Sequence, residues 1–399
     1  MAGYYLNPGN SGFERMTGSE YIDKTGLISL LNHTIGTADN LTCISRPRRF
    51  GKSYAAQMLC AYYGKGCNSH KLFEKWKISA DPSFEKHLNQ YDMIYLDLTN
   101  IKPYTDDYKT VVPFLISALT QEIREQYPNT AVSANFTATL ADMVDKAGNK
   151  VVMIIDEWDA PIRENPGTTR EYLEFLRSLF KNSAATSKIF AAAYMTGILP
   201  IKKDGSQSAV SDFREYTMLE PLEFAGYFGF TEDEVLALCK KHNMNFNGAK
   251  RWYDGYTVGT ARSIYNPYSV MSAVKNRRYK SYWKKTSAAE TLMTYIDMDQ
   301  DGLQEDIARL IAGERIVVDT ETFQNDVETF TCKDDVLTLL VHLGYLTYEE
   351  VSDSYDETDD SEMTGLVHIP NEEVRKEFEK ILRRSRHKSL MRLVQKSDQ

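Results

Sequence analysis

The chain has 399 residues, 42% hydrophobic and 26% charged, which is the balance of an ordinary globular protein with a sizeable core. Its net charge of -9 excludes a uniformly basic surface, although a local basic patch remains compatible with it. The five cysteines form no C-x-x-C pair, and the chain has neither a signal-peptide pattern nor a long apolar run. We therefore expect a cytoplasmic protein with no zinc site, no disulfide framework and no membrane partner.

The first half of the chain alternates apolar runs with helical patterns. After an irregular start at residues 1–20, a short helix is predicted over Tyr21–His33. The predicted strands are Leu41–Ser45, Asp92–Asn100, Lys150–Asp159 and Lys188–Gly197. The predicted helices are residues 51–64, 108–126, 134–146 and 169–183. This alternation predicts an α/β fold with a mostly parallel sheet and helices on both faces.

The second half has a different pattern. A helix with a capping box, Thr231 to Glu234, is predicted first, and aromatic turns at residues 250–259 and 263–275 lead into another helix. Residues 334–350 then predict a helix, a glycine turn and a strand. An acidic segment, a returning strand at 365–370 and a helix at 371–382 follow. Helix, hairpin and helix together are the outline of a winged-helix-like α+β module.

The stretch CISRPRRFGKS, Cys43 to Ser53, ends like a phosphate-binding loop. The pattern G-x-x-x-x-G-K-[ST] places backbone amides, a lysine and a hydroxyl around phosphates at a helix start. Gly51, Lys52 and Ser53 fit this pattern, but Arg46 occupies the position of the first glycine. A basic strand–helix turn on the surface is the alternative interpretation. The predicted nucleotide-binding residues are Pro47, Arg48, Arg49, Phe50, Gly51, Lys52, Ser53 and Tyr54.

A second element supports the phosphate loop. The apolar strand VVMIIDE ends in Asp156 and Glu157. A carboxylate at this place can hold Mg²⁺ together with Ser53, and a neighbouring glutamate can activate a water molecule. We predict Ser53 and Asp156 as metal ligands, and Lys52, Glu157 and Thr196 as catalytic residues. Thr196 ends the strand AAAYMTG, where it could contact the γ-phosphate, although a simple strand-end threonine is equally compatible.

Eight motifs in order carry a family resemblance: YIDKTGLI, SRPRRFGKS, IIDEWDAPI, TGILPI, WYDGY, IYNPYS, LLVHLGYLT and IPNEEV. Together they resemble the bacterial and archaeal AAA-ATPase-like family over nearly the whole chain. The arginine-containing loop is similar to those of STAND-type archaeal ATPases. The resemblance implies an AAA+-like core that binds ATP and Mg²⁺. It implies an ATPase-like domain at 1–225, a helical region at 226–284 and a winged-helix-like module at 285–399.

Members of this family often carry a C-terminal PD-(D/E)XK nuclease-like domain, and the chain shows no such constellation. Either that domain was lost or truncated or this member never had it, so we do not expect nuclease activity of this chain. A second copy of the chain or a nuclease-like domain is a possible partner. The basic run of the last helix, which begins at Arg375, could contact DNA phosphates or be a solvated face. Arg214 could serve a neighbouring subunit as an arginine finger or form a surface ion pair.

Three functions remain open from the sequence. The favoured one is an AAA+-type ATPase that uses hydrolysis to drive a conformational change. A nucleotide-gated switch with negligible turnover would use the same residues. A DNA-binding module from a nuclease system is the third, and a small-molecule kinase is disfavoured because no acceptor-site pattern is present.

Overall fold

The computed structural model describes residues 3–101, 110–164, 169–181, 183–201, 203–204, 207–208, 210, 212–283, 302–321, 323, 330, 332–350 and 364–384. Its internal contacts divide the chain into two units. The first unit comprises Met1–Ser45 and Lys52–Tyr216, and the second comprises Arg46–Gly51 and Thr217–Gln399. The predicted phosphate loop is therefore the place where the chain leaves the first unit and returns to it.

The first unit is built on a five-stranded parallel sheet of strand order β2-β3-β4-β1-β7. Its strands are β1 (Leu41–Ser45), β2 (Asp92–Asp97), β3 (Val151–Asp156), β4 (Phe190–Gly197) and β7 (Arg214–Tyr216). Every residue of β1, β3 and β4 is buried, as a parallel sheet covered on both faces requires. The predicted α/β fold with a parallel sheet is confirmed.

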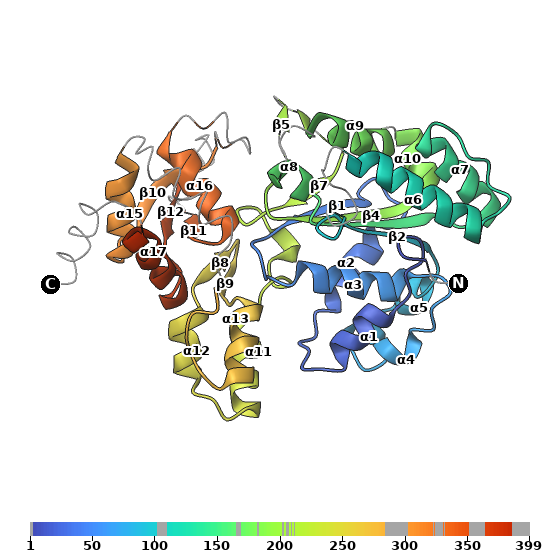
Figure 1. The fold of residues 1–399 in the computed structure, drawn as a ribbon. Coiled ribbons are helices and arrows are strands. Elements are labelled where there is room, and N and C mark those ends of the chain that lie inside the picture. Colours follow the sequence, from blue (N-terminus) through green and yellow to red (C-terminus); the bar gives the residue numbers. More distant parts are fainter. Residues whose placement is uncertain are drawn as a thin grey trace, which may run out of the picture. The chain divides into compact units, whose positions relative to one another are not determined.

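Helices cover both faces of this sheet (Figure 1). One group comprises α1 (Ser11–Thr17), α2 (Gly26–Thr34), α3 (Lys52–Tyr63), α4 (His70–Phe73), η1 (Lys77–Ala80) and α5 (Phe84–His87). The other comprises α6 (Val111–Gln126), α7 (Phe136–Ala147), α8 (Ala160–Glu164), α9 (Thr169–Phe180) and α10 (Ser183–Ile189). The short strands β5 (Lys203–Asp204) and β6 (Gln207–Ser208) pair with each other.

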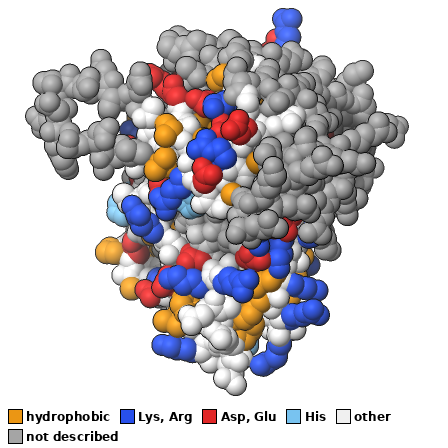
Figure 2. All heavy atoms as spheres, turned by 90° about the vertical axis from the view of Figure 1, so that its left-hand side faces the viewer, with side chains coloured by type: hydrophobic (Ala, Val, Ile, Leu, Met, Phe, Trp, Pro, Cys, Tyr) orange, Lys and Arg blue, Asp and Glu red, His pale blue; other side chains and the backbone are white. Residues whose placement is uncertain are grey.

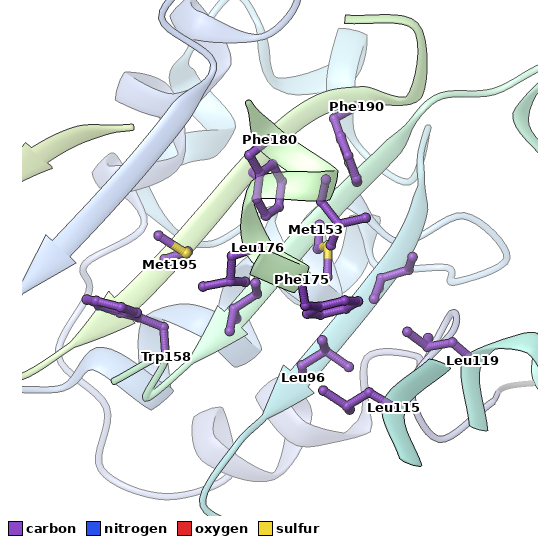
Figure 3. Close-up of a cluster of buried hydrophobic side chains, with 14 of the residues drawn as sticks. Leu96, Leu115, Leu119, Met153, Trp158, Phe175, Leu176, Phe180, Phe190 and Met195 are labelled. Atoms are coloured by element: carbon purple, nitrogen blue, oxygen red, sulfur yellow. The ribbon is translucent and has the colours of Figure 1, made fainter. Parts of the chain in front are cut away.

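The core between the sheet and the second helix group is shown in Figure 3. Met153 and Met195 from neighbouring strands face Phe175 and Leu176 of α9, and Leu115 of α6 closes the cluster. All of these side chains are buried. Both helices therefore contribute apolar side chains to one close-packed cluster against this face of the sheet.

Several boundaries differ from the predicted ones. β3 ends at Asp156 because Glu157 adopts a positive φ of 54°, so the predicted strand to Asp159 is three residues too long. β2 ends at Asp97, whose carboxylate accepts hydrogen bonds from the backbone and hydroxyl of Thr99. Residues 183–189 form helix α10, so β4 begins at Phe190 and not at Lys188. α2 begins at Gly26, after Asp23 accepts a turn hydrogen bond from Thr25.

The second unit combines helices with two small antiparallel sheets. Its first elements are η5 (Leu222–Phe224), α11 (Glu232–Lys241), α12 (Phe246–Tyr253), β8 (Tyr256–Val258), β9 (Ala261–Ile264) and α13 (Pro267–Asn276). The capping box of Thr231 and Glu234 is confirmed. The prediction of an aromatic turn at residues 250–259 is partly wrong, since Lys250–Tyr253 complete α12.

The remaining elements are α15 (Leu303–Ile311), β10 (Ile316–Asp319), α16 (Lys333–Leu343), β11 (Thr347–Glu350), β12 (Thr364–His368) and α17 (Glu372–Arg384). The strands form a sheet of order β10-β12-β11. The predicted helix, strand pair and helix are confirmed, and the acidic segment between the strands lies outside the described residues. The name winged helix and the three-part division at 225 and 284 stay predictions. Every helix that the structure describes is too short or too polar to span a bilayer.

Candidate functional site

The lysine and the serine of the predicted phosphate loop begin helix α3. Lys52 is its first residue and is only 3% exposed, and Ser53 follows it. Gly51, immediately before the helix, has a φ of 94°, which glycine adopts without steric cost. The fully buried β1 precedes the loop, so the strand, turn and helix start of a phosphate-binding loop are all present.

The predicted metal-binding carboxylate lies at the end of the central strand β3. Asp156 is buried, and the hydroxyl of Thr196 on the neighbouring β4 donates a hydrogen bond to its Oδ1. Burial raises the pKa of Asp156 from 3.8 to about 6, while the hydroxyls of Thr196 and Ser53 act in the opposite direction. The nearby carboxylates of Glu157 and Asp97 raise it further. A cation beside Asp156 would reverse this cost of burying a charge.

The residues at this strand end fit a magnesium site. Oδ2 of Asp156 is buried and has no hydrogen-bond partner among the residues that the structure describes. Its carboxylate and the Ser53 hydroxyl are oxygen donors, which Mg²⁺ prefers. An unsatisfied buried carboxylate oxygen is costly, and a bound cation would satisfy it.

The predicted catalytic glutamate lies between two cations. Oε1 of Glu157 is 3.4 Å from Nζ of Lys52, and its Oε2 is 3.0 Å from Nη2 of Arg163. The side chains of all three residues are at least four-fifths buried. The backbone amide of Glu157 also donates to the Thr196 hydroxyl over 3.3 Å. Lys52, Asp156, Glu157 and Thr196 therefore form one connected group, as the sequence predicted they should meet.

Arg163 belongs to this group and was missed in the sequence analysis. Its Nε lies 2.8 Å from Oδ2 of Asp159, one helical turn earlier. The same Asp159 oxygen accepts hydrogen bonds from the backbone amides of Ile198 and Leu199, just after β4. Asp159 thus anchors Arg163 rather than only capping α8. The spacing of four residues between Asp159 and Arg163 was the available signal.

The loop residues Arg46–Gly51 make their contacts inside the second unit. Arg46 is fully buried; its Nη1 donates to the carbonyl of Thr217, and its guanidinium lies 5.6 Å from the Phe228 ring centre. Arg49 lies 4.4 Å from the ring centre of Tyr268 and donates to the carbonyl of Tyr282. Arg46 is therefore a buried structural side chain of the loop.

The other predicted loop residues differ in exposure. Phe50 is buried against Tyr256, and its carbonyl accepts from the amide of Gly229. Pro47 is also buried, Arg48 is half-buried and Tyr54 is exposed. The contribution of these side chains to nucleotide binding stays a prediction. Arg214, the candidate arginine finger, forms an exposed ion pair with Asp39 in the structure.

The family comparison matches the part of the chain that contains this group. A family model described as predicted AAA-ATPase covers residues 9–206. Over these residues the chain is similar to the predicted AAA-ATPase family. The matched region includes Lys52, Ser53, Asp156, Glu157 and Thr196 and all strands of the central sheet except β7.

A search of curated proteins found an uncharacterized protein in the vnfD 5′ region of Azotobacter chroococcum mcd 1. It is 23% identical over 337 residues, which is 83% of this chain and 61% of the relative. The chain therefore spans less than two thirds of the length of this relative.

Among solved structures, the chain is similar to the Aeropyrum pernix ORC2 protein in ADPNP–ADP complexes, with 11% identity and a TM-score of 0.31. The match covers 94% of this chain and 93% of that one. The replication initiator DnaA bound to AMPPCP and single-stranded DNA is also 11% identical, with a TM-score of 0.32 and coverage of 93% and 86%. At these TM-scores the likeness supports no conclusion about function.

Proposed function

We propose that the chain is an ATPase that binds ATP with Mg²⁺ at the start of α3. The observation that carries this proposal is the placement of Glu157. It lies at the carboxyl end of β3, between Lys52 and Arg163 and next to the buried Asp156. In an open α/β sheet, ligands bind at this edge. A glutamate held there beside a lysine is positioned for phosphoryl chemistry.

In this proposal each residue has a separate task. The amides that precede α3 and Lys52 hold phosphate oxygens, and Ser53 and Asp156 hold Mg²⁺, which neutralises the charge that develops on the phosphates. Glu157 orients the attacking water and accepts its proton. Thr196 holds the Asp156 carboxylate in place, and contact with the γ-phosphate is a further role that we propose for it.

Hydrolysis would drive a conformational change, and a DNA-related or defence context fits the family resemblance. A homo-oligomer or a separate nuclease-like domain remains the proposed protein partner, and a cytoplasmic location is proposed with them. The proposed winged-helix-like module at residues 285–399 is supported, within its described part, by the strand order β10-β12-β11 and by the flanking helices. The alternative function is a nucleotide-gated switch, which would retain ATP binding without measurable turnover.

The test is phosphate release from ATP and Mg²⁺ by the full chain, combined with binding of a fluorescent ATP analogue. Lys52→Ala should lose both binding and turnover, since the cation that faces the phosphates is removed. Glu157→Gln should keep binding and lose turnover by about 100-fold or more, because its amide cannot accept the proton. If the wild type binds ATP without turnover, the switch replaces the ATPase. If the wild type does not bind ATP, the proposed site is wrong.

A further inference from the structure

The helical part of the second unit has a charge opposite to that of the whole chain. Residues 225–283 contain nine lysines and arginines but only four aspartates and glutamates, whereas the chain has a net charge of -9. All nine basic side chains are exposed. Such a local excess produces a positive potential that an acidic chain does not have elsewhere on average.

Two of these basic side chains, Lys250 and Arg251, are compensated. Lys250 lies 2.9 Å from Glu232, and Arg251 lies 3.9 Å from Glu372. Lys240, Lys275, Arg277 and Arg278 differ from them, because none forms an ion pair with another described residue. Their charge is therefore available to a partner.

The uncompensated charges gather where α11 and α13 end. Nη1 of Arg277 donates to the carbonyl of His242 over 2.9 Å, which brings the end of α13 against the end of α11. The hydroxyl of Tyr279 donates to the carbonyl of Asn245 and fixes the following turn. We call the resulting surface the basic tip, and it consists of Lys240, Lys275, Arg277, Arg278 and Lys280. In Figure 2 lysines and arginines predominate among the charged side chains in the lower part of the view, over α11–α13.

The C-terminal helix, for which the sequence left DNA contact and a solvated face open, has its described charges paired. Within its described part, Arg375 pairs with Glu372 and Glu379, Lys376 pairs with Glu372, and Lys380 pairs with Glu377. These acids pair with the basic residues of α17 whose side chains the structure describes. The basic residues beyond Arg384 lie outside the described residues. Among the described side chains of the second unit, the distribution of uncompensated positive charge therefore favours the basic tip over α17 as the surface that attracts an anionic partner.

The chemistry of the tip favours a phosphate polymer as its partner. Protein hot spots and membrane-inserting surfaces need exposed apolar anchors. The large hydrophobic side chains that are exposed in the described chain are Tyr4, Tyr54, Val132, Leu222, Tyr268 and Val317. None of them belongs to the basic tip, and the ring of Tyr268 already contacts the guanidinium of Arg49. Lysine and arginine without such anchors are the composition of a surface that contacts a nucleic-acid backbone.

We propose that the basic tip at the ends of α11 and α13 binds the phosphate backbone of nucleic acid without reading its sequence. Counterion release makes such binding strongly dependent on salt, with a slope of about -0.9 in log affinity against log salt for each phosphate of duplex DNA. The binding does not require nucleotide, so its success or failure is independent of the proposed ATPase.

The experiment measures fluorescence anisotropy of labelled duplex DNA, single-stranded DNA and duplex RNA at several salt concentrations, without ATP. The variant replaces Lys240, Lys275, Arg277 and Arg278 by glutamine. A control variant replaces Lys71, Lys75, Lys77 and Lys86, four exposed lysines of the first unit, in the same way. All four replaced side chains are exposed, and because Arg277 also donates to the carbonyl of His242, the melting temperatures of both variants are measured to separate a loss of binding from a loss of folding.

We expect the tip variant to lose about 10-fold or more in affinity and about three to four units of salt slope on duplex DNA, while the control keeps both. Equal losses in the two variants would overturn the proposal, since they would indicate unspecific charge. Polyglutamate and vesicles that contain phosphatidylserine serve as alternative polyanions. If either binds the wild type more tightly than all three nucleic acids, or if no nucleic acid binds, the proposal is wrong.

Discussion

At the scale of single residues, the arrangement around Glu157 depends on Arg163. Glu157 has a positive φ of 54°, which is uncommon for a residue with a side chain. Contacts of its carboxylate must therefore keep the residue in this conformation. Arg163 binds Glu157 with one nitrogen and Asp159 with another, and Asp159 is itself fixed by two backbone amides. The guanidinium of Arg163 therefore links Glu157, through Asp159, to the backbone of the segment after β4. We infer that Arg163 is a positioning residue of the proposed ATPase.

Arg163→Gln should therefore reduce turnover while leaving ATP binding intact. Glutamine cannot bridge Glu157 and Asp159, and a small misplacement of a reacting group can cost up to about 100-fold in rate. We expect at least a tenfold loss of turnover with an unchanged affinity for a fluorescent ATP analogue. The matched control is Arg170→Gln, which removes an exposed arginine that pairs with Glu174 on α9.

A second readout does not involve activity. Unfolding free energies of Arg163→Gln, Glu157→Gln and the double variant form a cycle, and we expect a coupling of about 1 kcal/mol or more between the two partly buried side chains. Additive effects would show that the two residues do not interact and would remove the basis for the positioning role.

The site was only partly predictable from the sequence at this scale. Asp156 and Glu157 were recognised because an apolar strand that ends in two acids is a local pattern. Arg163 was not recognised, since its role depends on α8 returning its guanidinium to Glu157 across six residues. The burial of Arg46 could not be predicted for a similar reason: a sequence shows an arginine in a loop, but its burial depends on Thr217 and Phe228, about 170 residues later.

At the scale of elements, the turn from β1 into α3 depends on backbone conformation more than on side chains. Gly51 has a φ of 94°, and a methyl group added there would meet no atom within 4 Å. Substitution would therefore strain the backbone without a clash. Gly66 offers a comparison, because its φ is 83° and it too has open space around it, but it follows the end of α3 rather than preceding its start.

Gly51→Ala and Gly66→Ala should each lower the free energy of unfolding by about 1–2 kcal/mol, the cost of a side chain in the left-handed region. Only Gly51→Ala should also weaken ATP binding, since relaxation of the strain moves the amides that precede Lys52. Urea unfolding and binding of a fluorescent ATP analogue measure the two effects. Equal binding by both variants would mean that the turn conformation does not matter for the nucleotide.

The elements themselves were largely predictable, and their ends were less so. β1 was predicted to the residue because it is a short buried run bounded by Arg46 and Pro47. The start of β4 was predicted two residues too early. Lys188 and Ile189 directly precede the apolar strand in sequence, but in the structure they complete α10. Helix or strand at such a junction is decided by packing, which a short window does not contain.

At the scale of the whole molecule, two buried ionisable groups of the second unit act on stability in opposite directions. Glu373 on α17 accepts from the backbone amide of Tyr282 and faces Arg49, and burial raises its pKa from 4.5 to about 7. His342 on α16 stacks on Phe323, and burial together with the charge of Arg46 lowers its pKa from 6.5 to about 3. Each group is held in its neutral form near pH 5.

These shifts determine the sign of the pH dependence. Between about pH 4.5 and 7 the unfolded chain has lost the Glu373 proton while the folded chain retains it, so this group makes stability fall as the pH rises. Between about pH 3 and 6.5 the unfolded chain has a protonated His342 while the folded chain does not, so this group makes stability fall as the pH falls. In the range from pH 4.5 to 6.5 the two contributions oppose each other.

Single substitutions should separate the two contributions. Relative to the wild type, Glu373→Gln should gain stability as the pH rises from 5 to 8, by about 3 kcal/mol, since a neutral amide replaces a carboxylate that must ionise while buried.

His342→Phe keeps an aromatic ring beside Phe323 and should gain stability relative to the wild type as the pH falls from 7 to 5, by about 2 kcal/mol. Urea unfolding of the full chain at pH 5, 6, 7 and 8, followed by tryptophan fluorescence, measures both differences. A difference between variant and wild type that stays constant over this range would show that the replaced group does not titrate with a shifted pKa. Gains in the two variants with opposite pH dependence would instead confirm that the second unit contains two buried groups of opposing effect.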